Sequence, residues 1–267
     1  YMSFLTPFTY GIDASGGLLP LDDGPLLEEA RRLGTAPLMH LSTLTETDSF
    51  SSGRAVMVLT DPAMQEALIE QILATVAAKG YRGVDVDFEY IPGDQREAYA
   101  DFIRRLRTRL APAGLPVTVA LAPKTHPEQP GLLYEAHDYA LLGAAADFVL
   151  LMTYEWGYTA GPPMAVAPLP NVREVLDYAV TEIPREKIYL GIPNYGYDWP
   201  LPFAEGRTRA RSLSNQEAVE LAVRYGAEIQ FDAAAQAPWF NYTAPDGVPH
   251  VVWFEDARSM SAKLRLI

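Results

Sequence analysis

The sequence predicts an α/β protein built on a parallel sheet, and two observations support that prediction. Short apolar runs alternate along the chain with amphipathic stretches of helical period, which is typical of consecutive βα units. The chain has 267 residues, of which 49% are hydrophobic, and this is enough for one large core. We therefore expect a single domain of barrel size over residues 1–267.

The expected strands of the parallel sheet are short and apolar. They cover residues 3–11, 36–43, 83–90, 117–123, 146–154 and 187–195. After Trp199 the pattern changes to strand-like pieces separated by turn residues such as Asp246 and Gly247. These pieces, at 227–232, 238–243 and 249–254, predict a small β elaboration near 227–254.

The helices between the strands are predicted from their end signals. One begins at Asp61 and Pro62, an N-cap followed by a proline in the first turn, and stops at Gly80. Two more helix starts are predicted by pairs with the three-residue spacing of a capping box, Asp94 with Glu97 and Ser214 with Glu217.

Composition excludes several classes of partner and site. The 34 acidic and 21 basic side chains give a formal charge of -13, and no run of Lys and Arg could neutralise phosphates, so we expect no nucleic acid partner. No apolar run approaches the roughly 20 residues that span a bilayer. The absence of cysteine excludes a disulfide framework and a cysteine nucleophile. Since the chain begins without an initiator Met, we interpret it as a fragment of a longer protein.

The 83–90 strand carries three acids on one face. Successive side chains of a strand point to opposite sides, so Asp85, Asp87 and Glu89 share the face toward the barrel interior. Buried strands of parallel sheets are normally apolar, which makes three inward carboxylates costly. Crowded like charges raise the pKa of at least one of them, and Glu89, at the open C-terminal end, could then stay protonated near neutral pH as a general acid.

Two other interpretations of this strand remain open. A surface strand with alternating acids has the same pattern. A metal site built from the three acids is the second, although of four histidines only His40 lies on a predicted barrel strand. We predict no metal and no cofactor.

The 146–154 strand ends in polar and aromatic residues. Strand parity points Met152 and Tyr154 inward, with Tyr154 at the mouth of the barrel. Barrel enzymes place their working groups at this C-terminal end of the strands. A packed structural hydroxyl is the alternative interpretation of a tyrosine in this position.

These two segments together resemble glycoside hydrolase family eighteen, the chitinase-like barrels. The family motif D-x-x-D-x-D-x-E is matched by residues 82–89 with Arg82 in place of the first Asp. The motif M-x-Y-D is matched by residues 152–155 with Glu155 in place of the Asp, and Gly-Ile-Pro-x-Tyr-Gly-Arg by residues 191–197 with Tyr197 in place of the Arg. The resemblance implies a TIM (β/α)8-type barrel, of which this chain lacks the first and last strands.

The departures from these motifs favour one branch of the family. Residues 152–168, 194–199, 226–232 and 253–259 are similar to the spore-germination hydrolases, cortex-lytic N-acetylglucosaminidases of spore-forming bacteria that often carry LysM modules. This resemblance implies an N-acetylated glycan as substrate, LysM modules elsewhere in the full-length protein, and a location in the spore coat or cell envelope, outside the cytoplasm.

The resemblance implies retaining, substrate-assisted hydrolysis of β-glycosidic bonds next to N-acetylglucosamine in spore-cortex peptidoglycan or a related glycan. The nucleophile would be the 2-acetamido oxygen of the substrate. Glu89 would protonate the leaving oxygen, and Asp87 would orient the acetamide. Asp85 would share a proton with Asp87, and Tyr154 would hydrogen-bond the acetamide.

The residues expected to contact the sugar share a place near strand ends, where rings stack and polar tips hold hydroxyls. They are Tyr10, Met152, Glu155, Trp156, Asn194, Tyr195 and Tyr197. A non-catalytic glycan-binding protein on the same barrel is the competing function. Its signature would be loss of the acid at position 89, and Glu89 is present.

Overall fold

The computed structural model describes residues 2–47 and 49–267, which form two compact units. The first unit runs to Leu151 and includes Tyr178–Tyr189. The second comprises Met152–Asp177 and Leu190–Ile267.

The first unit contains a five-stranded sheet in the order β3-β4-β5-β6-β7. Strands β3 to β6 pair in parallel, and each neighbour in the sheet is also the next strand along the chain, as consecutive βα units require. The strands are β3 (Met39–Ser42), β4 (Val84–Asp87), β5 (Val117–Leu121), β6 (Phe148–Leu151) and β7 (Ile188–Leu190).

The predicted first strand forms in pieces. β1 (Phe4–Leu5) pairs in parallel with β2 (Ala36–Pro37), and Tyr10 bridges to Leu41 in β3. Pro7 lies between the two pairings, and its missing N–H explains why the strand is interrupted.

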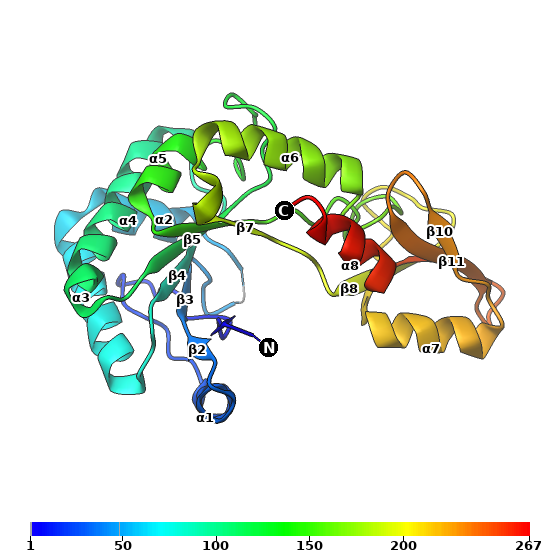
Figure 1. Cartoon of the computed structure of the whole chain (residues 1–267), viewed down its shortest axis with the longest axis horizontal. Helices are drawn as coiled ribbons and strands as arrows, with labels where there is room; N and C mark the ends of the chain where they lie inside the picture. Colours follow the sequence, from blue (N-terminus) through cyan, green and yellow to red (C-terminus); the bar gives the residue numbers. More distant parts are fainter. Residues whose placement is uncertain (1, 48) are drawn as a thin grey trace. The chain divides into compact units, whose positions relative to one another are not determined.

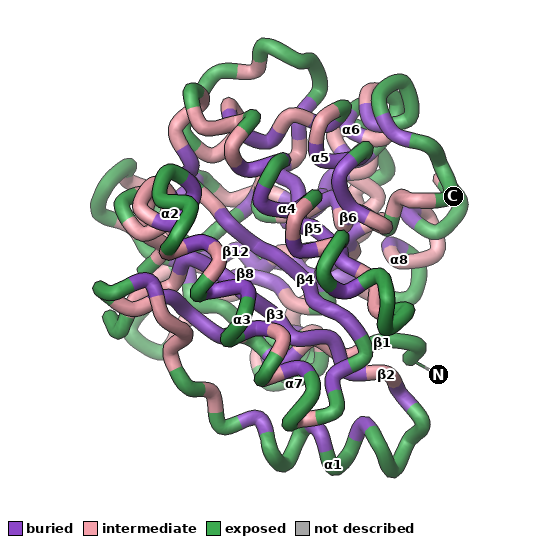
Figure 2. The backbone as a smooth tube through the Cα atoms, turned by 90° about the vertical axis from the view of Figure 1, so that its left-hand side faces the viewer, coloured by how far each residue is buried: buried purple, intermediate pink, exposed green. Residues whose placement is uncertain are grey.

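Helices flank this sheet, and Figure 1 shows α3, α4 and α5 lying along one side of β3 to β5. Behind the end of β4, the Phe88 ring stacks on Tyr99 and Phe102 of α4, with ring centroids 5.7 and 5.5 Å apart. The sheet is therefore buried, as the tube of Figure 2 shows for β3, β4 and β5. The helices are α1 (Gly24–Leu33), α2 (Ser52–Thr60), α3 (Pro62–Lys79), α4 (Arg96–Leu110), α5 (Tyr139–Ala145) and α6 (Leu169–Glu182), with 3-10 turns η1 (Gly93–Gln95), η2 (Ala111–Ala113) and η3 (Arg185–Lys187).

The second unit contains a five-stranded antiparallel sheet in the order β10-β11-β12-β8-β9. The three strands predicted near 227–254 are confirmed as β10, β11 and β12. Two further strands, β8 and β9, extend the same sheet. Pro193 lies in the gap where the predicted 187–195 strand divides into β7 and β8. The elements are β8 (Tyr195–Pro200), β9 (Arg211–Ser214), α7 (Asn215–Tyr225), β10 (Gln230–Asp232), β11 (Ala237–Thr243), β12 (Pro249–Trp253) and α8 (Ala257–Leu264).

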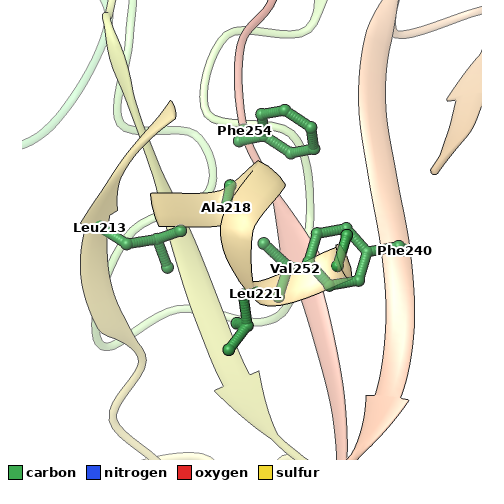
Figure 3. Close-up of a cluster of buried hydrophobic side chains, with 7 residues drawn as sticks. Leu213, Ala218, Leu221, Phe240, Val252 and Phe254 are labelled. Atoms are coloured by element: carbon green, nitrogen blue, oxygen red, sulfur yellow. The ribbon is translucent and has the colours of Figure 1, made fainter. Parts of the chain in front are cut away.

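Helix α7 covers one face of this sheet. Figure 3 shows Ala218 and Leu221 of α7 packed with Phe240 of β11 and Val252 of β12 in a buried apolar cluster. This cluster gives the second unit its own core. No helix in the described part of the chain is both long and apolar enough to cross a bilayer.

Two of the predicted helix starts are confirmed and one is wrong. Asp61 accepts hydrogen bonds from the N–H groups of Ala63 and Met64, and the Ser214 capping box is present at α7. The predicted Asp94 cap is absent, because residues 93–95 form η1 and α4 begins at Arg96 without a side-chain cap. An N-cap requires extended backbone, which a residue inside a 3-10 turn lacks.

These capping geometries predict different effects for two substitutions of the same kind. Asp61→Ala should lower the free energy of unfolding by about 1 kcal/mol, because the first N–H groups of α3 lose their acceptor. Asp94→Ala should change it by less than about 0.5 kcal/mol. Urea unfolding of both variants measures this, and equal losses would mean that Asp94 also caps a helix.

Candidate functional site

The acids of β4 lie on the inner face of the first unit, as strand parity predicts. Asp85 and Asp87 are each only 6% exposed, which makes the surface-strand interpretation wrong. Glu89 lies two residues beyond the end of β4 and is partly buried. Thr118, the register partner of Asp85 on β5, donates its hydroxyl hydrogen to Asp85 Oδ1.

Burial and mutual repulsion determine which of these acids keep a proton. Burial raises the pKa of Asp87 well above its usual range, and the charges of Glu89 and Asp85 raise it further. Burial also raises the pKa of Glu89 from 4.5 to about 7. Glu89 is therefore poised to donate and recover a proton near neutral pH.

Asp87 has an unused acceptor. Its Oδ1 is buried, and no residue in the described part of the chain hydrogen-bonds it. A buried polar atom without a partner costs free energy, so a ligand N–H placed there would be held strongly. This is the property expected of a residue that orients an acetamide.

His40 on β3 faces the same acids. Its Nε2 lies 3.9 Å from Asp85 Oδ2 and 3.7 Å from Asp87 Oδ2, and its Nδ1 lies 2.6 Å from Thr9 Oγ1. Burial lowers the pKa of His40, and the charge of Asp85 only partly opposes this. A neutral His40 has no positive charge to balance the nearby carboxylates. The negative charge of this row is therefore reduced when a carboxyl group takes up a proton.

The described residues include no group of three or more His, Cys, Asp or Glu side chains that could hold a metal ion. The three-acid metal site considered from the sequence therefore has no support in the geometry. The row of acids is better suited to proton transfer than to ligation.

In the second unit, three predicted sugar contacts form one hydrogen-bonded cluster. Tyr195 donates its hydroxyl hydrogen to Glu155 Oε1 at 2.5 Å, and the Tyr197 hydroxyl lies 3.0 and 3.1 Å from the two oxygens of Glu155. Burial raises the pKa of both tyrosines, and Glu155 raises it further, so both hydroxyls remain donors. Glu155 is exposed and has a left-handed backbone with φ 68°, which directs its carboxylate onto the two hydroxyls.

The remaining predicted residues of the second unit lie near this cluster. Tyr154 is partly buried and packs against the apolar group that includes Tyr197 and Trp199. Trp156 and Met152 are partly buried and Asn194 is exposed. Their contacts with a sugar, and the grouping of Tyr154 with the acids of β4, stay predictions.

Tyr10 does not have the geometry predicted for it. Its side chain is 3% exposed, and its hydroxyl donates to Asp23 Oδ2 at 2.6 Å. Tyr81 donates to the same oxygen, and Lys79 Nζ lies 2.6 Å from Asp23 Oδ1. The ring is thus enclosed in a buried polar network, which leaves no face for a sugar.

Sequence reasoning did not assign two residues that touch the acids. Thr118 lies on the predicted 117–123 strand, but its pairing with Asp85 depends on the register between two strands. For His40, the sequence pattern indicates only a possible metal ligand. The order of the strands and the register between them are the signals that place Thr118 and His40 beside the acids.

Comparisons with known proteins agree with the resemblance seen in the motifs. The model of the family "Glycosyl hydrolases family 18" matches residues 45–267. The cortical fragment-lytic enzyme of Bacillus subtilis (strain 168) is 43% identical over 269 residues, covering 100% of this chain and 62% of that enzyme. This chain thus spans about three-fifths of the length of that relative.

Solved structures show the same fold. The spore cortex-lytic enzyme SleL of Bacillus megaterium QM B1551 superposes with a TM-score of 0.95 at 42% identity, covering 100% of this chain and 61% of that one. A chitinase from Chromobacterium violaceum ATCC 12472 gives 0.87 at 28% identity, covering 97% and 80%. The predicted chitinase-like α/β fold of the TIM type is confirmed by these likenesses.

The raised pKa of Glu89 predicts a pH-dependent stability. Because the folded state holds this proton more tightly, stability falls as the pH rises between 4.5 and about 7. Glu89→Gln removes this loss, so its stability relative to wild type should rise by roughly 2 kcal/mol between pH 4 and pH 8, after allowance for partial exposure. Urea unfolding at both pH values measures the difference. The exposed Glu186→Gln is the matched control, and a pH-independent difference for Glu89→Gln would contradict the raised pKa.

Proposed function

Because this chain belongs to glycosyl hydrolases family 18, we propose that it hydrolyses β-glycosidic bonds next to N-acetylglucosamine in spore-cortex peptidoglycan. The observation that carries the proposal is Glu89, a carboxyl with a pKa of about 7 at the end of a strand whose other acids are buried. A carboxylic acid in this state can protonate a leaving oxygen at neutral pH.

The first step breaks the glycosidic bond. Glu89 gives its proton to the bridging oxygen while the 2-acetamido oxygen of the substrate attacks the anomeric carbon, forming an oxazolinium intermediate. Asp87 accepts the acetamide N–H, for which its unpaired Oδ1 is available. Burial favours the protonated form of Asp87 in the free protein, and the positive charge that develops on the acetamide favours its ionised form. The proton that Asp87 gives up passes to the neighbouring Asp85.

The second step restores the protein. The Glu89 carboxylate takes a proton from water, and that water opens the oxazolinium from the face the leaving group occupied. Two displacements at the same carbon retain the β configuration. Asp85, held by Thr118, stays close enough to Asp87 to influence its proton. By resemblance to the M-x-Y-D motif, Tyr154 hydrogen-bonds the acetamide.

The cluster of Glu155, Tyr195 and Tyr197 is proposed as a sugar-binding element. The Glu155 carboxylate is exposed and is oriented by two hydroxyl donors, so its remaining lone pairs can accept hydrogen bonds from sugar hydroxyls. The two tyrosine rings lie edge to face at 5.8 Å, an arrangement that limits the motion of both.

The relatives suggest where this activity belongs. Their names refer to cortical fragments and the spore cortex, which supports the proposal that this protein acts in the spore coat or cell envelope. LysM modules in the remainder of a longer protein are part of the same proposal.

Glu89→Gln tests the proton donor. The variant should lower kcat on purified cortex fragments by at least about 10²-fold, because the amide has no proton to give. Mass spectrometry of new reducing ends measures release of fragments ending in N-acetylglucosamine, with Glu186→Gln as the matched control.

The same assay separates the two functions. If wild type and Glu89→Gln both bind the fragments and neither cuts them, the protein is a glycan-binding module and the hydrolase proposal fails.

The acetamide requirement is tested through the substrate. An oligosaccharide with a 2-hydroxyl in place of the 2-acetamido group should be cut at least about 10²-fold more slowly than the acetylated form, since it lacks the nucleophile. Proton NMR of the first product should show the β anomer. Equal rates, or an initial α anomer, would contradict substrate assistance.

A further inference from the structure

Glu89 lies beyond the paired part of its strand. β4 ends at Asp87, so the sheet ladder does not hold the peptide groups on either side of Glu89. A proton donor must nevertheless remain within hydrogen-bond reach of the bond it cleaves. The backbone carbonyls of Phe88 and Tyr90 show how this position is held.

On the Phe88 side, the contact comes from His137, which precedes α5. The His137 Nε2 lies 2.9 Å from the Phe88 carbonyl oxygen, and the Ala122 N–H donates to His137 Nδ1 at 2.7 Å. Since a backbone N–H can only donate, Nδ1 is the acceptor and Nε2 carries the hydrogen that Phe88 accepts. Burial lowers the pKa of His137 to about 4, so this tautomer persists at neutral pH.

His137 itself is rigidly placed. Its ring is fully buried. Tyr139, two residues further along the chain, donates its hydroxyl hydrogen to the Ala122 carbonyl oxygen at 2.7 Å. The Lys124 N–H donates to the same hydroxyl at 2.9 Å. The segment before α5 is thus tied at two points to the residues after β5, and through His137 to the residue before Glu89.

On the Tyr90 side, the contact comes from Ser52, the first residue of α2. Its hydroxyl donates to the Tyr90 carbonyl oxygen at 2.6 Å. Tyr90 has a left-handed backbone with φ 56°, a conformation that is strained for a non-glycine residue. The Ser52 hydrogen bond and the contact of the Tyr90 ring with Phe50, at 6.1 Å between centroids, oppose relaxation of this turn.

We propose that His137 and Ser52 are positioning residues that clamp the chain on both sides of Glu89, His137 at the Phe88–Glu89 peptide group and Ser52 at the Tyr90–Ile91 peptide group, and so hold the Glu89 carboxyl in place for proton transfer. The catalytic meaning of the clamp rests on the proposed function. Its two donors come from elements far apart in the chain, so the end of β4 is restrained from two sides. Displacement of a reacting group by about 1 Å can cost about 10²-fold in rate, which is the scale of effect the clamp prevents.

A matched pair of substitutions isolates the bond to Phe88. In His137→Gln the side-chain amide can still donate to Phe88, because its nitrogen reaches the place of Nε2. In His137→Asn the shorter amide can still accept from Ala122 but cannot reach Phe88. We expect His137→Asn to lower kcat about 10- to 100-fold with KM changed less than about threefold, and His137→Gln to keep kcat within about threefold of wild type.

The ionisation of Glu89 supplies a second measurement. Loosening of the clamp admits water, so the pKa of Glu89, about 7 in the intact protein, should fall toward its ordinary value in His137→Asn. The basic limb of the pH–rate profile should move to lower pH accordingly. A carbon-13 NMR titration of the Glu89 carboxyl reports the same shift without any substrate. A purely structural role of His137 would reduce the folded fraction and leave this pKa unchanged.

Ser52 gives an independent arm. Ser52→Ala suits the first turn of a helix and should leave the melting temperature almost unchanged while lowering kcat about threefold to tenfold. Ser52→Thr keeps the hydroxyl and should restore the rate. His126→Asn, the same substitution at an exposed position, is the control for the His137 pair.

The outcomes separate the clamp from the hydrolase proposal. If His137→Asn and His137→Gln have equal kcat and equal Glu89 pKa, and Ser52→Ala matches wild type, the clamp is overturned. If the His137 variants do not fold, Ser52→Ala against Ser52→Thr decides the question. If wild type cuts no glycan, the hydrolase proposal fails, and the NMR titrations of the same variants still confirm or overturn the clamp.

Discussion

The row of acids on β4 places the largest electrostatic demand on the first unit. Two of its carboxyl groups are almost completely buried, where an unpaired charge is very costly. The fold meets this cost by letting Asp87 keep its proton and by giving Asp85 the hydroxyl of Thr118. Burial lowers the pKa of the neighbouring His40, so its ring favours the neutral form and does not add a fixed positive charge beside the acids. The pKa values of Asp87 and Glu89 therefore stay raised, and both groups can take part in proton transfer.

The apolar residues on the other face of β4 fix the register of the strand and so keep the acids in the interior. Val84, Val86 and Phe88 are fully buried, and the Phe88 ring is stacked on α4. A shift of one residue would expose this apolar set and place the acids against the helices. Past the last ladder bond, hydrogen bonds from His137 and Ser52 take over the role of the sheet.

The departures from the family motifs are not independent of one another. Glu155 replaces an aspartate and Tyr197 replaces an arginine, and in this structure the two are hydrogen-bonded. The Tyr197 hydroxyl thus holds the Glu155 carboxylate, and Tyr195 adds a second donor. Arg82, in place of the first aspartate, is exposed at the start of β4, away from the buried part of the row.

Features that arise from local periodicity could be predicted from the amino-acid sequence. The period of two placed the acids on one face, and end signals located the starts of α3 and α7, since both depend on residues a few positions apart. The prediction of an N-cap at Asp94 is wrong because the three-residue spacing of a capping box also occurs where a 3-10 turn precedes the helix, as it does here.

The surroundings of the acids, in contrast, depend on contacts between distant parts of the chain. Thr118 is 33 residues from Asp85 and His137 is 49 from Phe88, so neither contact leaves a local pattern. The buried hydrogen bond between the Tyr10 hydroxyl and Asp23 likewise leaves no pattern in the sequence. The pKa of Glu89 is likewise a property of the fold, because it is set by the water that packing removes rather than by the neighbours in the chain.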